Sequence, residues 1–418
     1  MRQIGVVAVE KDELLSYPMS RECPFDPPPQ YGELRRDAPF KRVRLWDGNQ
    51  PWLLTRHEDV KKALTQSNLS AEPLREGYPH IFEARLAADK ADRSFIRLDP
   101  PEHGRLRKMV IKEFTVRNVE KEKPHIQEIV DRLIDKMLAG PQPLEFVKEF
   151  AEPLPTEVIA YLLGVPYEDR EIFHRATRVQ FGSTSTPEEV GASLKELLAY
   201  LDDLISKKET DPQDDILSRL VTEQLVPGHL DRPAMVDITR LLLSAGHQTS
   251  INMTALSVLT LLQHPEELAK IESNPELIHG AVQELLRYSS VIQAGVRRVA
   301  REDAEVNGHL VKKGEGVICA LSSANRDEEV FVDPDRFDVT RDASAHLAFG
   351  YGIHQCLGQM LARVELEITI ATLFSRIPGL RLAVPFDELR FREDMFVYGV
   401  YELPLTWNKR DLESMNEE

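Results

Sequence analysis

The stretch FGYGIHQCLG, residues 349–358, contains one of only three cysteines in a chain of 418 residues. Three glycines surround Cys356, and a histidine lies two residues before it. After the cysteine, apolar residues recur at steps of four, three, four and three, which is one face of a helix: Leu357, Leu361, Val364, Ile368 and Ala371. This spacing predicts that Cys356 lies at or near the N-terminus of a helix.

A cysteine in this position has few chemical roles open to it. Unpaired backbone N–H groups and the helix dipole stabilise a thiolate, and flanking glycines let the backbone approach a flat ligand closely. Zinc is disfavoured because no second Cys or His lies at ligand spacing, and the C-x-x-C-H of covalent haem attachment is absent. A single thiolate ligand to a haem iron fits these exclusions. A buried structural cysteine, the more common fate of a lone Cys, stays open at this point.

Composition excludes several classes of partner. The formal net charge of −17 disfavours nucleic acid and anionic membrane surfaces. No apolar run approaches the roughly 20 residues that a membrane span needs, and the first thirty residues do not read as a signal peptide. The cysteines are odd in number and show no paired spacing, which favours a reducing compartment. We therefore expect a cytoplasmic protein.

The rest of the chain reads mainly as helix. Residues 40–56 predict a hairpin around Asp47-Gly48, and Asn307-Gly308 marks a second turn between short strands. Residues 234–263 are apolar on nearly all sides, which predicts a central buried helix that stops before Pro265. The polar stretch 207–215 reads as a loop. We expect one domain over residues 1–418, mainly α with small peripheral β-sheets.

The cysteine stretch resembles the signature of the cytochrome P-450 family, with Phe349, Gly352, Cys356 and Gly358 in matching positions and Gly350 within the loop. Other motifs follow in the family's order along nearly the whole chain, and the closest similarity is to soluble actinobacterial members. The resemblance implies the cytochrome P-450 fold and haem b (iron protoporphyrin IX), with Cys356 as the iron ligand.

Glu284 and Arg287 resemble the family's E-x-x-R pair, and Arg336 resembles the arginine that joins it. Taken alone, an i, i+3 pair is most simply a surface salt bridge worth under about 1 kcal/mol. The resemblance implies instead a buried structural group that positions the cysteine loop.

Four basic residues resemble the ligands of the haem propionates: His103, Arg107, Arg298 and His346. His103 and Arg107 are four apart and so share a helix face, and buried carboxylates need such partners. Arg297 lies next to Arg298 and competes with it for this role. For any single member, a solvated surface charge is the simpler interpretation.

Residues 245–250, AGHQTS, resemble the family's oxygen-binding segment, in which small residues precede an acid and a threonine. Ala245, Gly246 and Thr249 match this pattern, but Gln248 stands where an acid is usual. A threonine in mid-helix often only bonds its own i−4 carbonyl, so this interpretation depends on the cysteine motif.

The implied reaction is monooxygenation: one oxygen atom of dioxygen enters a lipophilic substrate, with electrons from ferredoxin and an NAD(P)H-dependent ferredoxin reductase. A peroxide-dependent or oxidative-coupling enzyme stays open, as does a haem-binding sensor without turnover. Thr249 favours the monooxygenase, whereas Gln248 keeps the alternatives in view. We expect Arg105, Lys108 and Lys112 to form a basic stripe for an acidic electron carrier.

The substrate pocket is predicted from helical spacing and from the resemblance. Leu241 and Ala245 lie one and two turns before Thr249, and the resemblance adds Ala294, Phe396 and Val397. All five are apolar, as pocket walls usually are, although core packing explains such residues equally well. Polar contacts to substrate are expected from the loop-like segment 72–97, which carries Arg75, Tyr78, His80 and Arg85.

Overall fold

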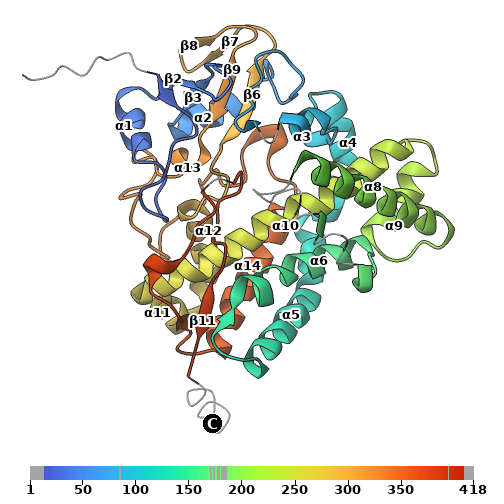
Figure 1. Ribbon diagram of the computed structural model, residues 1–418, viewed down its shortest axis with the longest axis vertical. Coiled ribbons are helices and arrows are strands. Elements are labelled where there is room, and N and C mark those ends of the chain that lie inside the picture. Colours follow the sequence, from blue (N-terminus) through green and yellow to red (C-terminus); the bar gives the residue numbers. More distant parts are fainter. Residues whose placement is uncertain are drawn as a thin grey trace, which may run out of the picture.

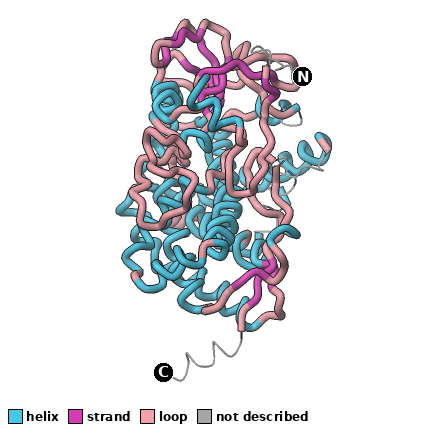
Figure 2. Tube along the Cα trace, turned by 90° about the vertical axis from the view of Figure 1, so that its left-hand side faces the viewer, coloured by secondary structure: helices cyan, strands magenta, loops and turns pink. Residues whose placement is uncertain are grey.

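The computed structural model describes residues 14–408, except 84–85, 170–171, 173–174, 177–178, 180–185 and 394. The predicted class is confirmed, because helices dominate and the strands gather in small sheets at the ends of the molecule (Figures 1 and 2). The longer helices are α1 (Gln30–Asp37), α2 (His57–Thr65), α4 (Glu102–Val110), α5 (Val116–Ala139), α6 (Pro153–Leu163), α8 (Pro187–Thr210), α10 (Arg232–Gln263), α11 (Pro265–Ser273), α12 (Ile278–Tyr288) and α14 (Gln359–Arg376). Shorter ones are α3 (Leu86–Ala91), α9 (Ile216–Leu220), α13 (Leu321–Ala324) and the 3-10 turns η3 (Ile111–Phe114) and η8 (Gly352–His354).

Helix α10 crosses the centre of the molecule (Figure 1). Asp231 caps its start by accepting a hydrogen bond from the Ala234 backbone N–H at 2.8 Å, and Pro233 occupies its first turn, where a missing N–H costs nothing. The helix ends at Gln263, directly before His264-Pro265. The predicted buried helix is confirmed, and α10 packs against α6, α8, α11, α12 and α14.

A six-stranded sheet lies at one end of the molecule (Figure 2), in the order β1-β2-β3-β9-β6-β4. Its strands are β1 (Leu15–Ser16), β2 (Phe40–Arg44), β3 (Trp52–Leu54), β4 (Leu69–Ser70), β6 (Val296–Ala300) and β9 (Gly316–Cys319). Strands β2 and β3 pair antiparallel, which confirms the hairpin predicted over residues 40–56. Helix α2 packs on this sheet and against the short helix α13.

The remaining strands form two smaller sheets. Strands β7 (Ala304–Val306) and β8 (His309–Val311) pair around Asn307 and Gly308, which have φ of 47° and 81°. The predicted turn is thereby confirmed. Near the other end of the molecule, β10 (Arg381–Leu382), β11 (Pro404–Thr406) and β5 (Leu144–Glu145) form the third sheet.

The loop predicted over residues 207–215 is wrong in its first half. Helix α8 continues to Thr210, and only residues 211–215 leave the helix. Lys207 and Lys208 lie in the last turn, where positive charge is favourable beside the unpaired carbonyls. Lys208 also pairs with the buried Asp215, so a stretch that reads as solvated is partly packed.

Candidate active site

The segment around Cys356 forms a tight loop between η8 and α14. The Cys356 backbone N–H donates to the Phe349 carbonyl at 2.9 Å and closes the loop, and α14 begins three residues later. Gly350 and Gly352 have φ of 68° and 75°, a conformation that side chains disfavour. A side chain on Gly352 would also lie 2.7 Å from the Leu64 carbonyl oxygen, so the loop rests directly on α2.

The Cys356 thiol is accessible although it lies deep in the protein. Burial raises the pKa of the thiol, while the Gly358 N–H and the guanidinium groups of Arg107 and Arg363 act in the opposite direction. A cation bound at the sulfur would act in the same direction as these three groups and favour the thiolate. No cluster of three or more metal-binding side chains occurs in the described part of the chain.

On α10, one short stretch is exposed in the middle of an otherwise buried helix. Ala245 and Gly246 are exposed, whereas Leu243 and His247 on either side are buried. Thr249 is half-buried, and its hydroxyl donates to the Ala245 carbonyl at 2.8 Å. Small residues thus leave space beside the centre of α10, with a hydroxyl one turn further on.

The other predicted pocket residues are less accessible. Leu241 and Val397 are each 6% exposed, and Ala294 is fully buried. Phe396 is half-buried, and the Arg297 guanidinium lies 5.4 Å from its ring centroid. Of the five predicted wall residues, only Ala245 and Phe396 therefore offer substantial accessible surface.

The residues expected to meet substrate oxygens from segment 72–97 are engaged elsewhere. Arg75 bonds Ser70 at 2.8 Å and pairs with Glu72, while the buried Tyr78 hydroxyl accepts from Arg97 at 3.1 Å. His80 is also buried, with Nδ1 3.6 Å from an Asp89 carboxylate oxygen. Arg85 lies outside the described residues. The three described side chains are therefore held by contacts within or beside the segment.

A cluster of basic side chains lies beside the cysteine loop. The rings of His103 and His354 are 4.0 Å apart, and the Arg107 guanidinium donates to the Gln355 carbonyl at 2.6 Å. His103 Nε2 and His354 Nδ1 are buried with no hydrogen-bond partner among the described residues. Burial, followed by Arg298, lowers the pKa of His354 to about 2.

Arg298 belongs to the same cluster, and Arg297 does not. Arg297 forms a buried ion pair with Asp89 at 2.5 Å, whereas the Arg298 guanidinium bonds, among the described residues, only the Arg297 carbonyl, at 2.8 Å. Burial lowers the pKa of the Arg298 guanidinium. Neither Arg107 nor Arg298 forms an ion pair within the described residues, so this region fits a ligand that brings carboxylates. A haem carries two propionates and therefore fits the cluster.

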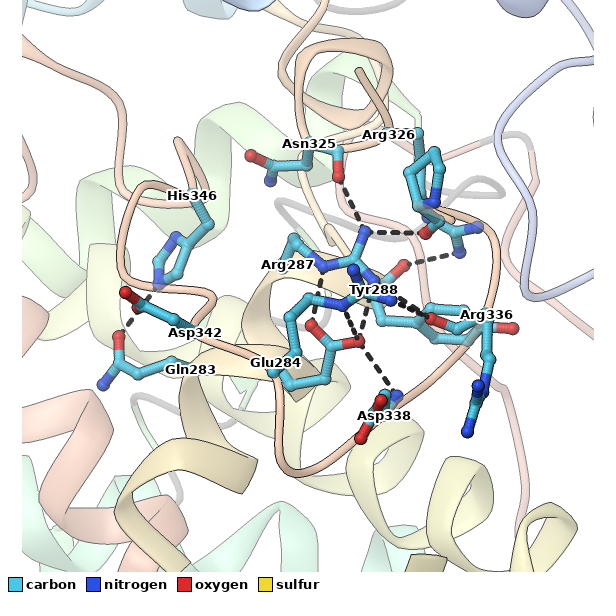
Figure 3. Close-up of polar contacts among 12 residues, drawn as sticks. Gln283, Glu284, Arg287, Tyr288, Asn325, Arg326, Arg336, Asp338, Asp342 and His346 are labelled. Carbon is cyan, nitrogen blue, oxygen red and sulfur yellow. Dashed lines mark hydrogen bonds and ion pairs between the residues drawn. The ribbon is translucent and has the colours of Figure 1, made fainter. Parts of the chain in front are cut away.

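His346 does not join this cluster, contrary to the expectation from the sequence. Its Nε2 lies 3.1 Å from Gln283 Oε1, and its Nδ1 accepts from the Ala348 backbone N–H at 3.1 Å (Figure 3). Both ring nitrogens are thus satisfied by protein groups. His354, which in the sequence was noted only as a neighbour of the cysteine, lies in the cluster instead.

Glu284 and Arg287 are completely buried, with the Arg287 guanidinium donating to the carboxylate at 2.6 and 2.7 Å. Arg287 also donates to the Asn325 and Pro334 carbonyls, at 2.9 and 2.7 Å (Figure 3). The Asn325 side chain accepts from the Leu347 N–H at 2.6 Å, just before the cysteine loop. A buried hydrogen-bonded path therefore connects this pair to the cysteine loop.

The prediction that the Arg336 side chain completes the group is wrong. Arg336 is exposed and contributes only its backbone carbonyl, 3.4 Å from Arg287 (Figure 3). Arg341 supplies the second guanidinium, with Nε 3.2 Å from Glu284 Oε1. The chain turns back after residue 336, because the Asp338 N–H also donates to Glu284, at 3.1 Å, and this brings Arg341 against the carboxylate.

A buried acid near Thr249 was not predicted. Burial raises the pKa of the Glu365 carboxyl on α14 to about 8, while Ser250, the residue after Thr249, acts in the opposite direction. The sequence did contain a signal, because Glu365 lies four residues after Leu361 and so interrupts the apolar face of that helix.

The predicted basic stripe on α4 and η3 is largely balanced by acids. Arg105 pairs with Glu102 at 2.6 Å, and Lys112 pairs with Glu223. Only Lys108 of the three has no ion pair within the described part of the chain. A continuous positive stripe is therefore not present.

Comparison with known proteins places this architecture. The Cytochrome P-450 family model matches residues 178–377. The chain is 49% identical to cytochrome P-450-SU2 of Streptomyces griseolus over 94% of this chain and 98% of that protein. It is 43% identical to pentalenic acid synthase of Streptomyces avermitilis, over 94% and 97%. The crystal structure of GfsF superimposes with a TM-score of 0.89 at 44% identity, covering 94% of this chain and all of that one.

The fold of this chain is that of the haem-thiolate enzymes among its solved relatives. At these identities over almost the whole chain, the protein belongs to the cytochrome P-450 family. It is a monooxygenase with haem b as cofactor, and its reaction takes dioxygen, a small-molecule substrate and electrons from a redox partner. None of the helices in the described residues has the length and apolar character needed to span a bilayer.

Proposed function

We propose that this enzyme hydroxylates or epoxidises a sizeable lipophilic substrate in the cytoplasm, with electrons from a ferredoxin and its NAD(P)H-dependent reductase. The residues 1–418 would act as one cytochrome P-450 domain. The observation that carries the proposal is the exposed Ala245-Gly246 stretch in the centre of α10, followed by the Thr249 hydroxyl. Relatives named mycinamicin VIII C21 methyl hydroxylase and pentalenic acid synthase support the substrate class.

Cys356 would hold the haem iron, and His103, Arg107, Arg298 and His354 would hold the propionates. The closed loop of Phe349, Gly350 and Gly358 around the cysteine leaves its thiol accessible. When bound, the haem supplies reductive activation of dioxygen and transfer of one oxygen atom to the substrate. Arg298 supports this assignment most strongly, because a buried guanidinium without a carboxylate partner needs a counter-charge.

Protons for the reaction would pass through Thr249. Gln248 cannot supply them, because an amide does not exchange a proton as a carboxylate does. Glu365 is a buried acid on α14, which packs against α10, and Ser250, the residue after Thr249, is close enough to lower its pKa. We infer that Glu365 replaces the missing acid at position 248 as the proton source.

The test of the proposed function compares two supplies of electrons. With NAD(P)H, ferredoxin and reductase, the wild type should form product from a ligand first identified by its spin-state shift. Thr249→Ala should lose most of that product and release peroxide or water instead, while Thr249→Ser retains it. Product formation with hydrogen peroxide alone, at the same rate in wild type and Thr249→Ala, would favour the peroxide-dependent alternative.

The raised pKa of Glu365 predicts a pH dependence. A carboxyl with a pKa of about 8 is protonated, and able to donate, below that pH and is ionised above it. The fraction of electrons recovered as product should therefore fall as pH rises through about 8. Glu365→Gln should give a low and pH-independent fraction. The control is Glu367→Gln on the same helix, whose half-buried carboxylate pairs with His279. An unchanged profile in Glu365→Gln would exclude this acid as the source.

A further inference from the structure

The C-terminal segment 391–400, which carries Phe396 and Val397, folds back on itself. Phe391 forms an antiparallel bridge with Val400, and the Arg392 backbone N–H donates to the Gly399 carbonyl at 2.8 Å. The two ends of the segment are thereby fixed to each other. Its conformation then depends on what holds the loop against the rest of the protein.

One side of this loop is attached to residues 291–293. Ile292 and Val397 form an antiparallel bridge, and the Tyr398 N–H donates to the Val291 carbonyl at 2.8 Å. The Gln293 side-chain amide donates to the Arg392 and Glu393 carbonyls at 3.2 and 3.1 Å, and to that of Met395. These bonds fix the loop to the segment that leads to Ala294.

The other side of the loop lies directly on α10. A methyl group on Gly399 would come within 1.8 Å of Asn252 Oδ1, so only glycine allows this approach. The Asn252 amide donates to the Gln248 carbonyl at 2.7 Å, one turn earlier on α10. From the loop, Arg392 Nη1 reaches the Gln248 side chain, donating to Oε1 at 3.2 Å.

This contact gives Gln248 a role that does not need a proton. The side chain is 7% exposed, and a guanidinium donating to an amide oxygen forms a charge-assisted hydrogen bond without a second buried charge. Thr249, the next residue, keeps its hydroxyl on the Ala245 carbonyl. The unusual glutamine is thus explained by its partner in the C-terminal loop.

We propose that Arg392 is a positioning residue that, through Gln248, holds the loop bearing Phe396 and Val397 against α10 and so sets the size of ligand the site accepts. This inference rests on the proposed function, because it concerns the same site. Arg392 and Gln248 would thus influence which ligands bind, although neither belongs to the exposed Ala245-Gly246 stretch of α10.

Spectral titration with two azoles tests the pair, using imidazole as the small probe and clotrimazole as the large one. Arg392→Gln should change the clotrimazole dissociation constant about tenfold and leave that of imidazole nearly unchanged. Arg392→Lys should restore part of the difference. Arg390→Gln is the matched control, since Arg390 lies by the same Tyr401 ring but its side chain is 73% exposed.

A double-variant cycle then asks whether Arg392 acts through Gln248. Gln248→Leu should change clotrimazole binding as Arg392→Gln does, and the double variant should change it no further. Additive effects, equal shifts for both azoles, or unchanged binding in Arg392→Gln would overturn the proposal. If the wild type bound neither azole, the proposed function itself would fail. If the wild type bound both azoles and only the expected effect of Arg392→Gln were missing, the positioning role alone would fail.

Discussion

Cys356→Ser should abolish the red-shifted Soret band of the reduced, CO-bound protein and reduce product formation to background. A serine hydroxyl cannot replace the electron-rich thiolate that favours O–O cleavage. Difference spectroscopy of the reduced protein with and without CO measures the band directly. The loss should be complete, because an imidazole from the neighbouring His354 or His103 would not give the band of thiolate ligation.

The other two cysteines provide matched controls. Cys319 is buried in the sheet, where burial raises the pKa of its thiol to about 12, and Cys23 is half-buried. Cys23→Ser should keep the full spectrum, and Cys319→Ala should keep it with some loss of stability. A normal thiolate band in Cys356→Ser would contradict the assignment of the iron ligand.

Arg287→Ala should destabilise the protein severely. Removing one partner of a completely buried ion pair leaves the other charge uncompensated and costs about 3–5 kcal/mol. This approaches the whole free energy of unfolding of an ordinary domain, about 5–15 kcal/mol. The variant should therefore yield little folded, haem-containing protein, measured by absorbance of the purified fraction and by its urea midpoint.

Variants of two neighbouring arginines should lose less stability than Arg287→Ala. Arg341→Gln removes one contact to Glu284 and hydrogen bonds to the carbonyls of Val332, Asp333 and Arg336. At this partly exposed position the loss should cost about 1–3 kcal/mol, less than Arg287→Ala. Arg336→Ala removes an exposed side chain whose backbone carbonyl remains in place, and it should change the unfolding midpoint by less than about 0.5 kcal/mol. A large loss in Arg336→Ala would restore the role that the sequence first suggested for it.

The sequence predicted the elements with strong local signals. The buried pattern of residues 234–263 corresponds to α10 within two residues at its start, and both glycine turns lie between paired strands. Such features depend on spacing and turn chemistry, which are local. The end of α8 was missed because a buried partner for Lys208, seven residues away, is not visible in a polar stretch.

The side-chain assignments were less predictable for a physical reason. His346 and His354 lie eight residues apart in one glycine-rich stretch, and only the fold of the loop decides which ring meets Arg298 and His103. Arg336 and Arg341 likewise follow the same turn, and the path of the backbone selects between them. Gln248 was correctly identified as unusual, but its partner Arg392 is 144 residues away.

Helix α10 is long enough to contact distant parts of the molecule as one continuous helix. At about 1.5 Å per residue, its 32 residues span about 48 Å. Arg240 near its start bonds Asp92 at 2.9 Å, Gln248 in the middle meets Arg392, and His264 at its end packs 5.1 Å from the ring of Phe337. Inserting one residue before Leu241 would rotate everything downstream by about 100° relative to Arg240. Evolution of this site should therefore proceed by exchange of side chains along α10 and by length changes in the loops around it, while the number of residues between Arg240 and Thr249 stays fixed.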